Sequence, residues 1–159
     1  MDKEMIKKDR LRYTKNKFSA NLTYVGILFN VLYFFSIYQS NVNTYYYNIK
    51  MGVSVLLNLV FLLVAFLCSE GVKTYKIGYA YTLLGVGALQ LIRILGYPSS
   101  AHNTLTKVNA VEVLVMDDKQ FVWVIFCLVA SAVACVVAGI VGIHKTRVLE
   151  NYKKEHGYV

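Results

Sequence analysis

The residues with the clearest chemical potential lie on one face of an apolar segment. Arg93 stands inside the stretch 77–96, which is otherwise uncharged from Ile77 onward. A guanidinium is costly in hydrocarbon, so it needs a partner, a wet cavity or a route to the membrane surface. Helical spacing at ~100° per residue places a set of side chains within an arc of roughly 80°: Tyr79, Thr82, Val86, Gln90, Arg93 and Tyr97. We call this set the polar seam, and we take Gln90, Arg93 and Tyr97 as candidate binding residues.

Three kinds of contact are open to Arg93. It precedes Pro98 by five residues, so roughly 7 to 8 Å of helix separates them and the long side chain can reach the headgroups. The alternatives are an ion pair with an acid of the next connection, or an anionic ligand at the outer face. That connection, residues 97–120, carries four further candidate residues: His102, Glu112, Asp117 and Asp118. All three alternatives place the contacts of Arg93 on the outer side.

Two asparagines lie near the midpoints of other apolar segments. Asn30 and Asn58 are each roughly 12 to 14 Å of helix from where their segments enter the membrane, so the two can meet at similar depth. Interhelical hydrogen bonds of this kind contribute ~0.6 kcal/mol on average. We expect the two amides to clamp a helix pair; the alternative is that they line a polar path.

Four apolar segments must position these residues. They cover about 21–38, 50–68, 77–96 and 121–143, and 57% of the whole chain is hydrophobic. Each segment approaches or exceeds the ~17 to 25 residues that cross a bilayer. The sequence therefore predicts an all-α polytopic membrane protein. We expect residues 1–159 to form a single domain, an antiparallel bundle of four transmembrane helices.

The basic residues predict the orientation of this bundle. Of the 17 Lys and Arg residues, thirteen lie in the arm 1–20, the connection after the second segment and the tail 144–159. The other two connections hold only three. This asymmetry is the positive-inside pattern, and it predicts that both termini are cytoplasmic. Because topology explains the net charge of +8, we expect no nucleic-acid partner. The abundance of Lys, Asn and Tyr is typical of a bacterial inner-membrane protein.

Small residues in the fourth segment predict close helix packing. Ser131, Cys135 and Gly139 recur every four residues, and Gly142 extends the same broad face. Such faces let helix backbones approach closely. We expect the partner to be the glycine stripe of the third segment, which includes Gly78 and Gly85, or else a neighbouring protein.

The long outer connection 97–120 contains an apolar run, 111–116, that is too short to cross the membrane. It can lie on the interface, form a short strand or cover the end of the bundle. Loops of this length are often functional. We therefore expect a specific external contact here.

No motif indicates catalysis, a metal or a cofactor. The three histidines, His102, His144 and His156, are scattered. None of the four segments contains Asp or Glu, which argues against a carboxylate-coupled carrier. We predict a non-catalytic accessory or regulatory subunit of a larger membrane complex, with a transporter as the first candidate. Its partners are then the lipid bilayer and another membrane protein, or further copies of itself. The alternatives are a homo-oligomeric channel or carrier, and a membrane enzyme using Arg93 and His102 on an anionic or lipid-linked substrate.

Overall fold

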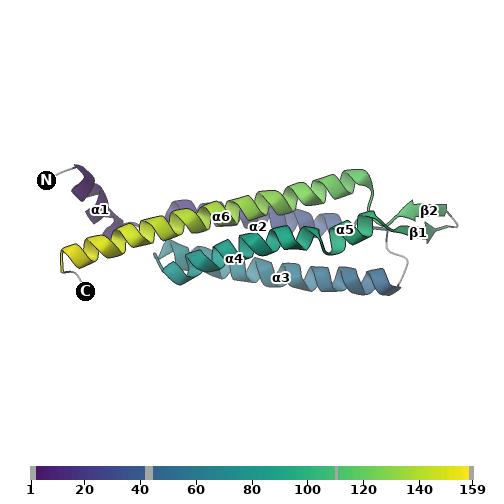
Figure 1. Cartoon of the computed structure of the whole chain (residues 1–159), viewed down its shortest axis with the longest axis horizontal. Coiled ribbons are helices and arrows are strands. Elements are labelled where there is room, and N and C mark those ends of the chain that lie inside the picture. The colour runs from purple at the N-terminus through teal and green to yellow at the C-terminus, as the bar shows by residue number, and fades with distance from the viewer. Residues whose placement is uncertain (1–2, 42–44, 110, 158–159) are drawn as a thin grey trace.

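The computed structural model describes residues 3–41, 45–109 and 111–157. Figure 1 shows the order of the elements along the chain. The helices are α1 (Lys3–Tyr13), α2 (Lys17–Ile37), α3 (Tyr45–Lys73), α4 (Ile77–Ile94), α5 (Tyr97–His102) and α6 (Asp118–Glu155). Two strands, β1 (Leu105–Val108) and β2 (Val111–Leu114), pair antiparallel as a hairpin.

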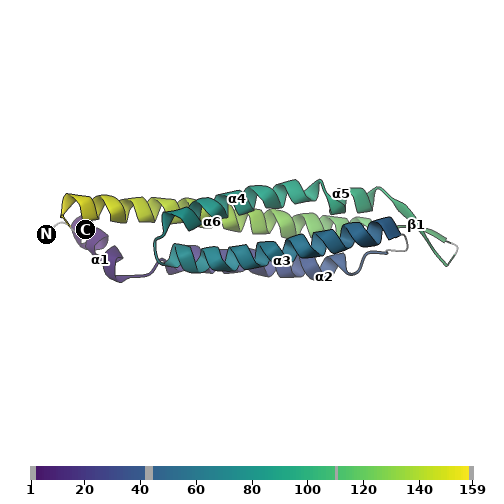
Figure 2. The same cartoon turned by 90° about the horizontal axis from the view of Figure 1, so that it is seen from below.

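Four helical units are long and apolar enough to cross a membrane, by length and composition. They are α2, most of α3, α4 together with α5, and α6. Figures 1 and 2 show them side by side in an elongated bundle, with both termini at one end and the β hairpin at the other. The protein is 81% helical, which confirms the predominantly α class. The β hairpin is added to this α-helical architecture. A short strand in residues 111–116 was one of the alternatives that the sequence allowed.

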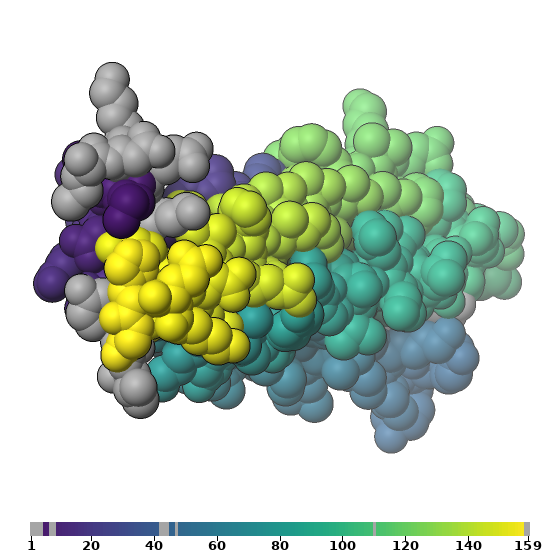
Figure 3. Space-filling view, turned by 60° about the vertical axis from the view of Figure 1, so that its left-hand side comes forward, coloured from purple at the N-terminus to yellow at the C-terminus, as the bar shows by residue number. Residues whose placement is uncertain are grey.

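Several helix boundaries differ from the expected ones, including both ends of α3, the start of α2 and the end of α6. α2 begins at Lys17, because the side chain of Asn16 accepts a hydrogen bond from the backbone N–H of Ser19 and caps the helix. α6 continues past residue 143 to Glu155, because Leu149 and Tyr152 are still buried along this extension. Figure 3 shows α1 beside this end of α6. The basic tail is therefore mostly helix.

The third long unit is interrupted but continues. α4 ends at Ile94, and Pro98 stands in the first turn of α5, where a missing backbone N–H costs nothing. Figures 1 and 2 show α5 extending in the direction of α4. Arg93 therefore lies nine residues before the end of the unit at His102, about 13 Å of helical rise. This is deeper than the proline alone suggested.

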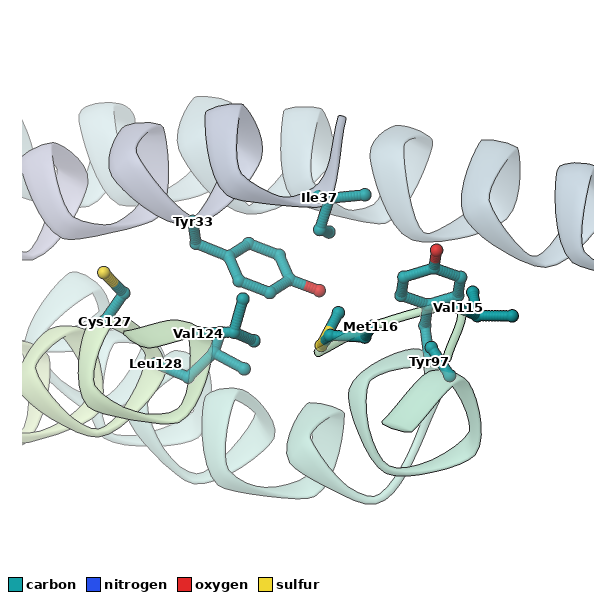
Figure 4. Packing of buried hydrophobic residues seen from close by; sticks show 9 residues of the cluster. Tyr33, Ile37, Tyr97, Val115, Met116, Val124, Cys127 and Leu128 are labelled. Carbon is teal, nitrogen blue, oxygen red and sulfur yellow. The ribbon is translucent and has the colours of Figure 1, made fainter. Parts of the chain in front are cut away.

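The hairpin end of the bundle is closed by an apolar cluster. Figure 4 shows Tyr33, Tyr97 and Met116 within it, together with residues of α2 and α6. The first four residues of the apolar run 111–116 form β2. The last two, Val115 and Met116, are buried, with 1% and 0% exposure. The backbone of Val115 accepts a hydrogen bond from Asn41 at 2.8 Å, which fastens the hairpin to the segment after α2.

The small-residue face of α6 packs against two helices. Ser131 and Cys135 face α2, where a Cβ placed on Gly26 would lie 3.1 Å from the Cys135 sulfur. Gly139 faces α4, where its Cβ would lie 2.9 Å from the carbonyl oxygen of Ala80. Gly142 also faces Ala80. Ser131, Cys135, Gly139 and Gly142 therefore lie at close approaches between helices.

The expected glycine stripe on α4 is wrong. A Cβ on Gly78 or Gly85 would meet nothing within 4 Å. Gly87 provides the contact with α6 instead, since its Cβ would lie 2.6 Å from the side chain of Val136. Gly78 and Gly85 lie on the exposed surface of α4, because the helix turns Ala80, Leu83 and Gly87 inward.

Candidate functional site

Arg93 is the centre of a polar network inside the bundle. Its Nη1 donates to Oε1 of Gln90 at 2.8 Å and to Oδ1 of Asn30 at 3.3 Å. Its Nη2 donates to Oδ1 of Asn58 at 3.0 Å. Three side-chain amides from three helices therefore hold one guanidinium.

Asn30 connects this guanidinium to the rest of the bundle. Its Oδ1 also accepts from Nε2 of Gln90 at 2.8 Å, and its Nδ2 donates to the carbonyl of Gly26 at 3.1 Å and to the hydroxyl of Ser131. The Nδ2 of Asn58 donates to the backbone oxygen of Asn30 at 3.3 Å. The network thus joins α2, α3, α4 and α6 at one level.

Two aromatic rings flank the guanidinium. The Cζ of Arg93 lies 4.8 Å from the ring centroid of Tyr33 and 4.9 Å from that of Phe61. The hydroxyl of Tyr33 is within 3.0 Å of the Ser54 hydroxyl. Cation–π contacts of this kind add ~0.5 to 2 kcal/mol each and shield the charge.

The charge of Arg93 is solvated but not neutralised. Its hydrogen-bond acceptors are neutral amides, and none of the ion pairs within the described ranges includes it. A buried charge without a counter-ion is costly even when it is hydrogen-bonded. Asn58 and Gln90 are fully buried, whereas Arg93 is only half-buried. Arg93 therefore lies at the edge of the network, where it lines an opening.

That opening is a groove between α3 and α4 with a volume of about 570 Å³. Arg93 lines it together with apolar side chains of both helices, among them Val53, Leu57, Leu89 and Ile92. A second hollow of about 290 Å³ runs on past Val64 and Gly85, and it shares Phe61 and Leu89 with the first. We call the two hollows together the α3–α4 groove.

The structure brings together only part of the predicted site. Gln90 and Arg93 join Asn30 and Asn58 in one network, in which the Asn58 amide donates to the backbone oxygen of Asn30 and not to its side chain. The expectation that Arg93 extends to the outer surface or pairs with a loop acid is wrong. Three of its N–H groups donate to amides inside the bundle, and α5 places the hairpin end farther away than expected.

The candidate residues of the outer connection serve local structure. His102 stacks on Phe121 at 4.2 Å and lies 3.8 Å from a carboxylate oxygen of Asp118. Glu112 lies 3.8 Å from Lys107 across the hairpin. Asp117 caps α6 by accepting from the backbone N–H of Gln120 at 2.8 Å. Tyr97 alone among the candidates of this connection lines the groove.

Four residues of the site were not singled out for this role: Tyr33, Ser54, Phe61 and Ser131. The first three are spaced three or four residues from Asn30 or Asn58, so helical periodicity places them on the same faces. Ser131 was assigned to packing because small residues surround it in the sequence.

No family model matches this sequence, and neither curated proteins nor solved structures show a significant match to it. The network and the groove beside it therefore carry the functional argument.

Proposed function

We propose that the protein is embedded in the cytoplasmic membrane with both termini in the cytoplasm. The four apolar helical units have the length that spanning requires. Both termini lie at the same end of the bundle (Figure 1), which agrees with an even number of crossings. Lys15 and Lys17 lie where α2 begins, and Lys145 and Arg147 lie in the last third of α6, with Lys145 bonded to Asn16; these bases are therefore near that end, as the positive-inside pattern requires.

Within the membrane, the protein acts as a non-catalytic binding subunit, an accessory to a larger membrane assembly. It recognises an anionic group of another membrane component through the α3–α4 groove. One observation carries this proposal: Arg93 lines the groove, and its hydrogen-bond acceptors are neutral amides. An anion in the groove would supply the missing counter-charge.

The packing of the polar network around Arg93 supports binding over conduction. Asn30 is 3% exposed, and Asn58, Gln90 and Ser131 are 0% exposed. Their polar groups are directed at one another within a single bundle. A path for ions needs polar groups that face a continuous wet passage. These residues instead fix the position of Arg93 at the groove.

A photo-cross-linking experiment tests this function. A photoreactive amino acid replaces Leu89, which lines the groove, in the full-length protein in its native membrane. The matched control replaces Val133, an exposed apolar residue of α6 that does not line the groove. We expect a defined adduct at position 89 that disappears when Arg93→Gln is added, and only diffuse lipid labelling at position 133.

Equal labelling at the two positions, or an adduct at position 89 that survives Arg93→Gln, would contradict a specific anionic partner. Tryptophan fluorescence of Trp123 and monodisperse elution check that the variants remain folded.

A further inference from the structure

We infer that the occupant of the α3–α4 groove is a single-chain amphiphile with a carboxylate head, such as a long-chain fatty acid, bound with its head at Arg93. This inference rests on the proposed function, since it names the anionic component that the groove recognises. It follows from the size of the groove, the order of polar and apolar residues along it, and the donors that Arg93 retains.

The size of the groove suits a small molecule and excludes a helix. Its two hollows measure about 570 and 290 Å³, and ligand sites for small molecules commonly measure ~300 to 1,000 Å³. A helix about 10 Å across takes up on the order of 1,200 Å³ in every 15 Å of its length. A single flexible chain can fill both hollows, whereas a partner helix could only lie over them.

The lining changes from polar to apolar along the groove. The lining of the larger hollow includes Lys50, Ser54 and Arg93 among mostly apolar residues. The smaller hollow is lined by apolar residues apart from Thr82, and the hydroxyl of Thr82 donates to the carbonyl of Gly78 within its own helix. Polar groups at one end and an apolar channel at the other match a molecule with a head and a tail.

Arg93 retains donors that fit a carboxylate. Three of the five N–H groups of a guanidinium donate to Asn30, Asn58 and Gln90. These amides do not use Nε–H and one Nη2–H. A guanidinium binds a carboxylate in bidentate fashion through two parallel N–H donors.

The depth of Arg93 favours a compact head on a single chain. The residue lies about 13 Å of helical rise below the end of α5. A carboxylate joined directly to its chain can descend that far between α3 and α4. The phosphate of a two-chain lipid is attached to a glycerol that stays at the surface, and its second chain has no corresponding channel.

Gly85 provides a test that leaves the Arg93 network untouched. It lines the smaller hollow, and a Cβ at this position meets nothing within 4 Å. A side chain added at position 85 therefore begins in open space beside the smaller hollow, and a leucine there should occupy part of the tail channel. Gly78 offers the matched control on the same helix, because its Cβ also meets nothing within 4 Å and it lines neither hollow.

The probe is palmitate, isotope-labelled at the carboxyl carbon and titrated into the full-length protein in nanodiscs of zwitterionic lipid. We expect saturable binding of one molecule per chain, with a carboxyl chemical shift that changes on binding. Methyl palmitate, which lacks the charge, and Arg93→Gln should each weaken binding about tenfold or more, because a charge-assisted contact is lost. Gly85→Leu should weaken palmitate about tenfold while octanoate still binds. Gly78→Leu should leave both unchanged.

Several results would overturn the inference. Equal binding of the methyl ester would show that the head is not recognised, and unchanged palmitate affinity in Gly85→Leu would show that the tail does not occupy the channel. Displacement of palmitate by phosphatidylglycerol at equal concentration would assign the groove to a two-chain lipid. A protein adduct at position 89 in the cross-linking experiment would overturn the fatty-acid assignment and leave the proposed binding function standing. The absence of any specific adduct would refute both.

Discussion

Replacing Asn30 and Asn58 by leucine, singly and together, tests whether Arg93 couples them. Their side chains touch the same guanidinium, at 3.3 and 3.0 Å. The direct bond between the two residues runs from the Asn58 amide to the backbone oxygen of Asn30, which the leucine at position 30 retains. Energetic coupling between the two side chains therefore passes through Arg93.

The expected magnitudes follow from the bonds that each change removes. Asn30→Leu removes interhelical bonds to Gln90, Arg93 and Ser131, which at ~0.6 kcal/mol each gives about 2 kcal/mol. Asn58→Leu removes two interhelical bonds, about 1 kcal/mol on the same scale. Once one amide is gone, Arg93 is less firmly held, so the second replacement costs less. We expect the double variant to be less destabilised than the sum by ~0.5 to 1 kcal/mol.

The assay is reversible unfolding in mixed micelles of increasing denaturing-detergent content, followed by circular dichroism at helix wavelengths. The control is the same cycle in an Arg93→Met background, which removes the shared donor. Coupling should disappear there.

Two results would refute the reasoning. Additivity within ~0.3 kcal/mol in the wild-type background would show that the two amides act independently. Coupling that persists in Arg93→Met would show that it travels by another route, such as a shift of α2 against α3.

Three further predictions use the same unfolding and labelling assays. Arg93→Lys should destabilise the protein by about 1 to 2 kcal/mol in detergent unfolding. A lysine ammonium is compact and lacks the planar fork of a guanidinium, so it cannot bond to acceptors on three helices at once. Gly87→Val should lower stability by at least ~1 kcal/mol, because its side chain meets α6, whereas Gly85→Val should stay within ~0.5 kcal/mol of wild type; equal effects would contradict the observed packing. A membrane-impermeant maleimide should label Asn109→Cys on intact cells and Glu150→Cys only after permeabilisation, with low background since the native cysteines are buried; the reverse pattern would invert the proposed orientation.

The number and order of the long helices could be predicted from sequence because each contains an apolar stretch long enough to cross a membrane, although α3 and α6 extend well beyond their apolar stretches. The level of the network could be predicted as well. Rise per residue is constant in a helix, so distance along the chain placed Asn30 and Asn58 at matching depth. The rotation of each helix about its axis was harder to predict. Apolar residues surround α2 on every side, as exposed Val25 and Phe35 show, so hydrophobicity does not mark its inner face.

The direction in which the Arg93 side chain points could not be predicted, because it depends on two features that lie outside its own apolar segment. One is that the third unit resumes as α5 beyond Gly96, which moves the hairpin end away from the guanidinium. The other is that neutral amides from neighbouring helices converge on it. None of the apolar segments contains a carboxylate, so the acids of the loop were the charged partners that the sequence offered. Each of those acids has a local task instead, as Asp117 has in capping α6.

In an apolar bundle of this kind, polar residues mark the side of each helix that faces the bundle interior. In proteins that fold in water, apolar residues mark that side. Asn30, Asn58, Gln90 and Ser131 are all buried, whereas large apolar residues such as Leu56 are 64% exposed. Because the four polar residues come from four different helices, their mutual hydrogen bonds fix how each helix is rotated. That same rotation turns Gly85 away from α6 and toward the groove. The network that holds the charge of Arg93 therefore also shapes the channel beside it, and a variant that loosens the network should weaken binding in the groove even where it leaves Arg93 itself unchanged.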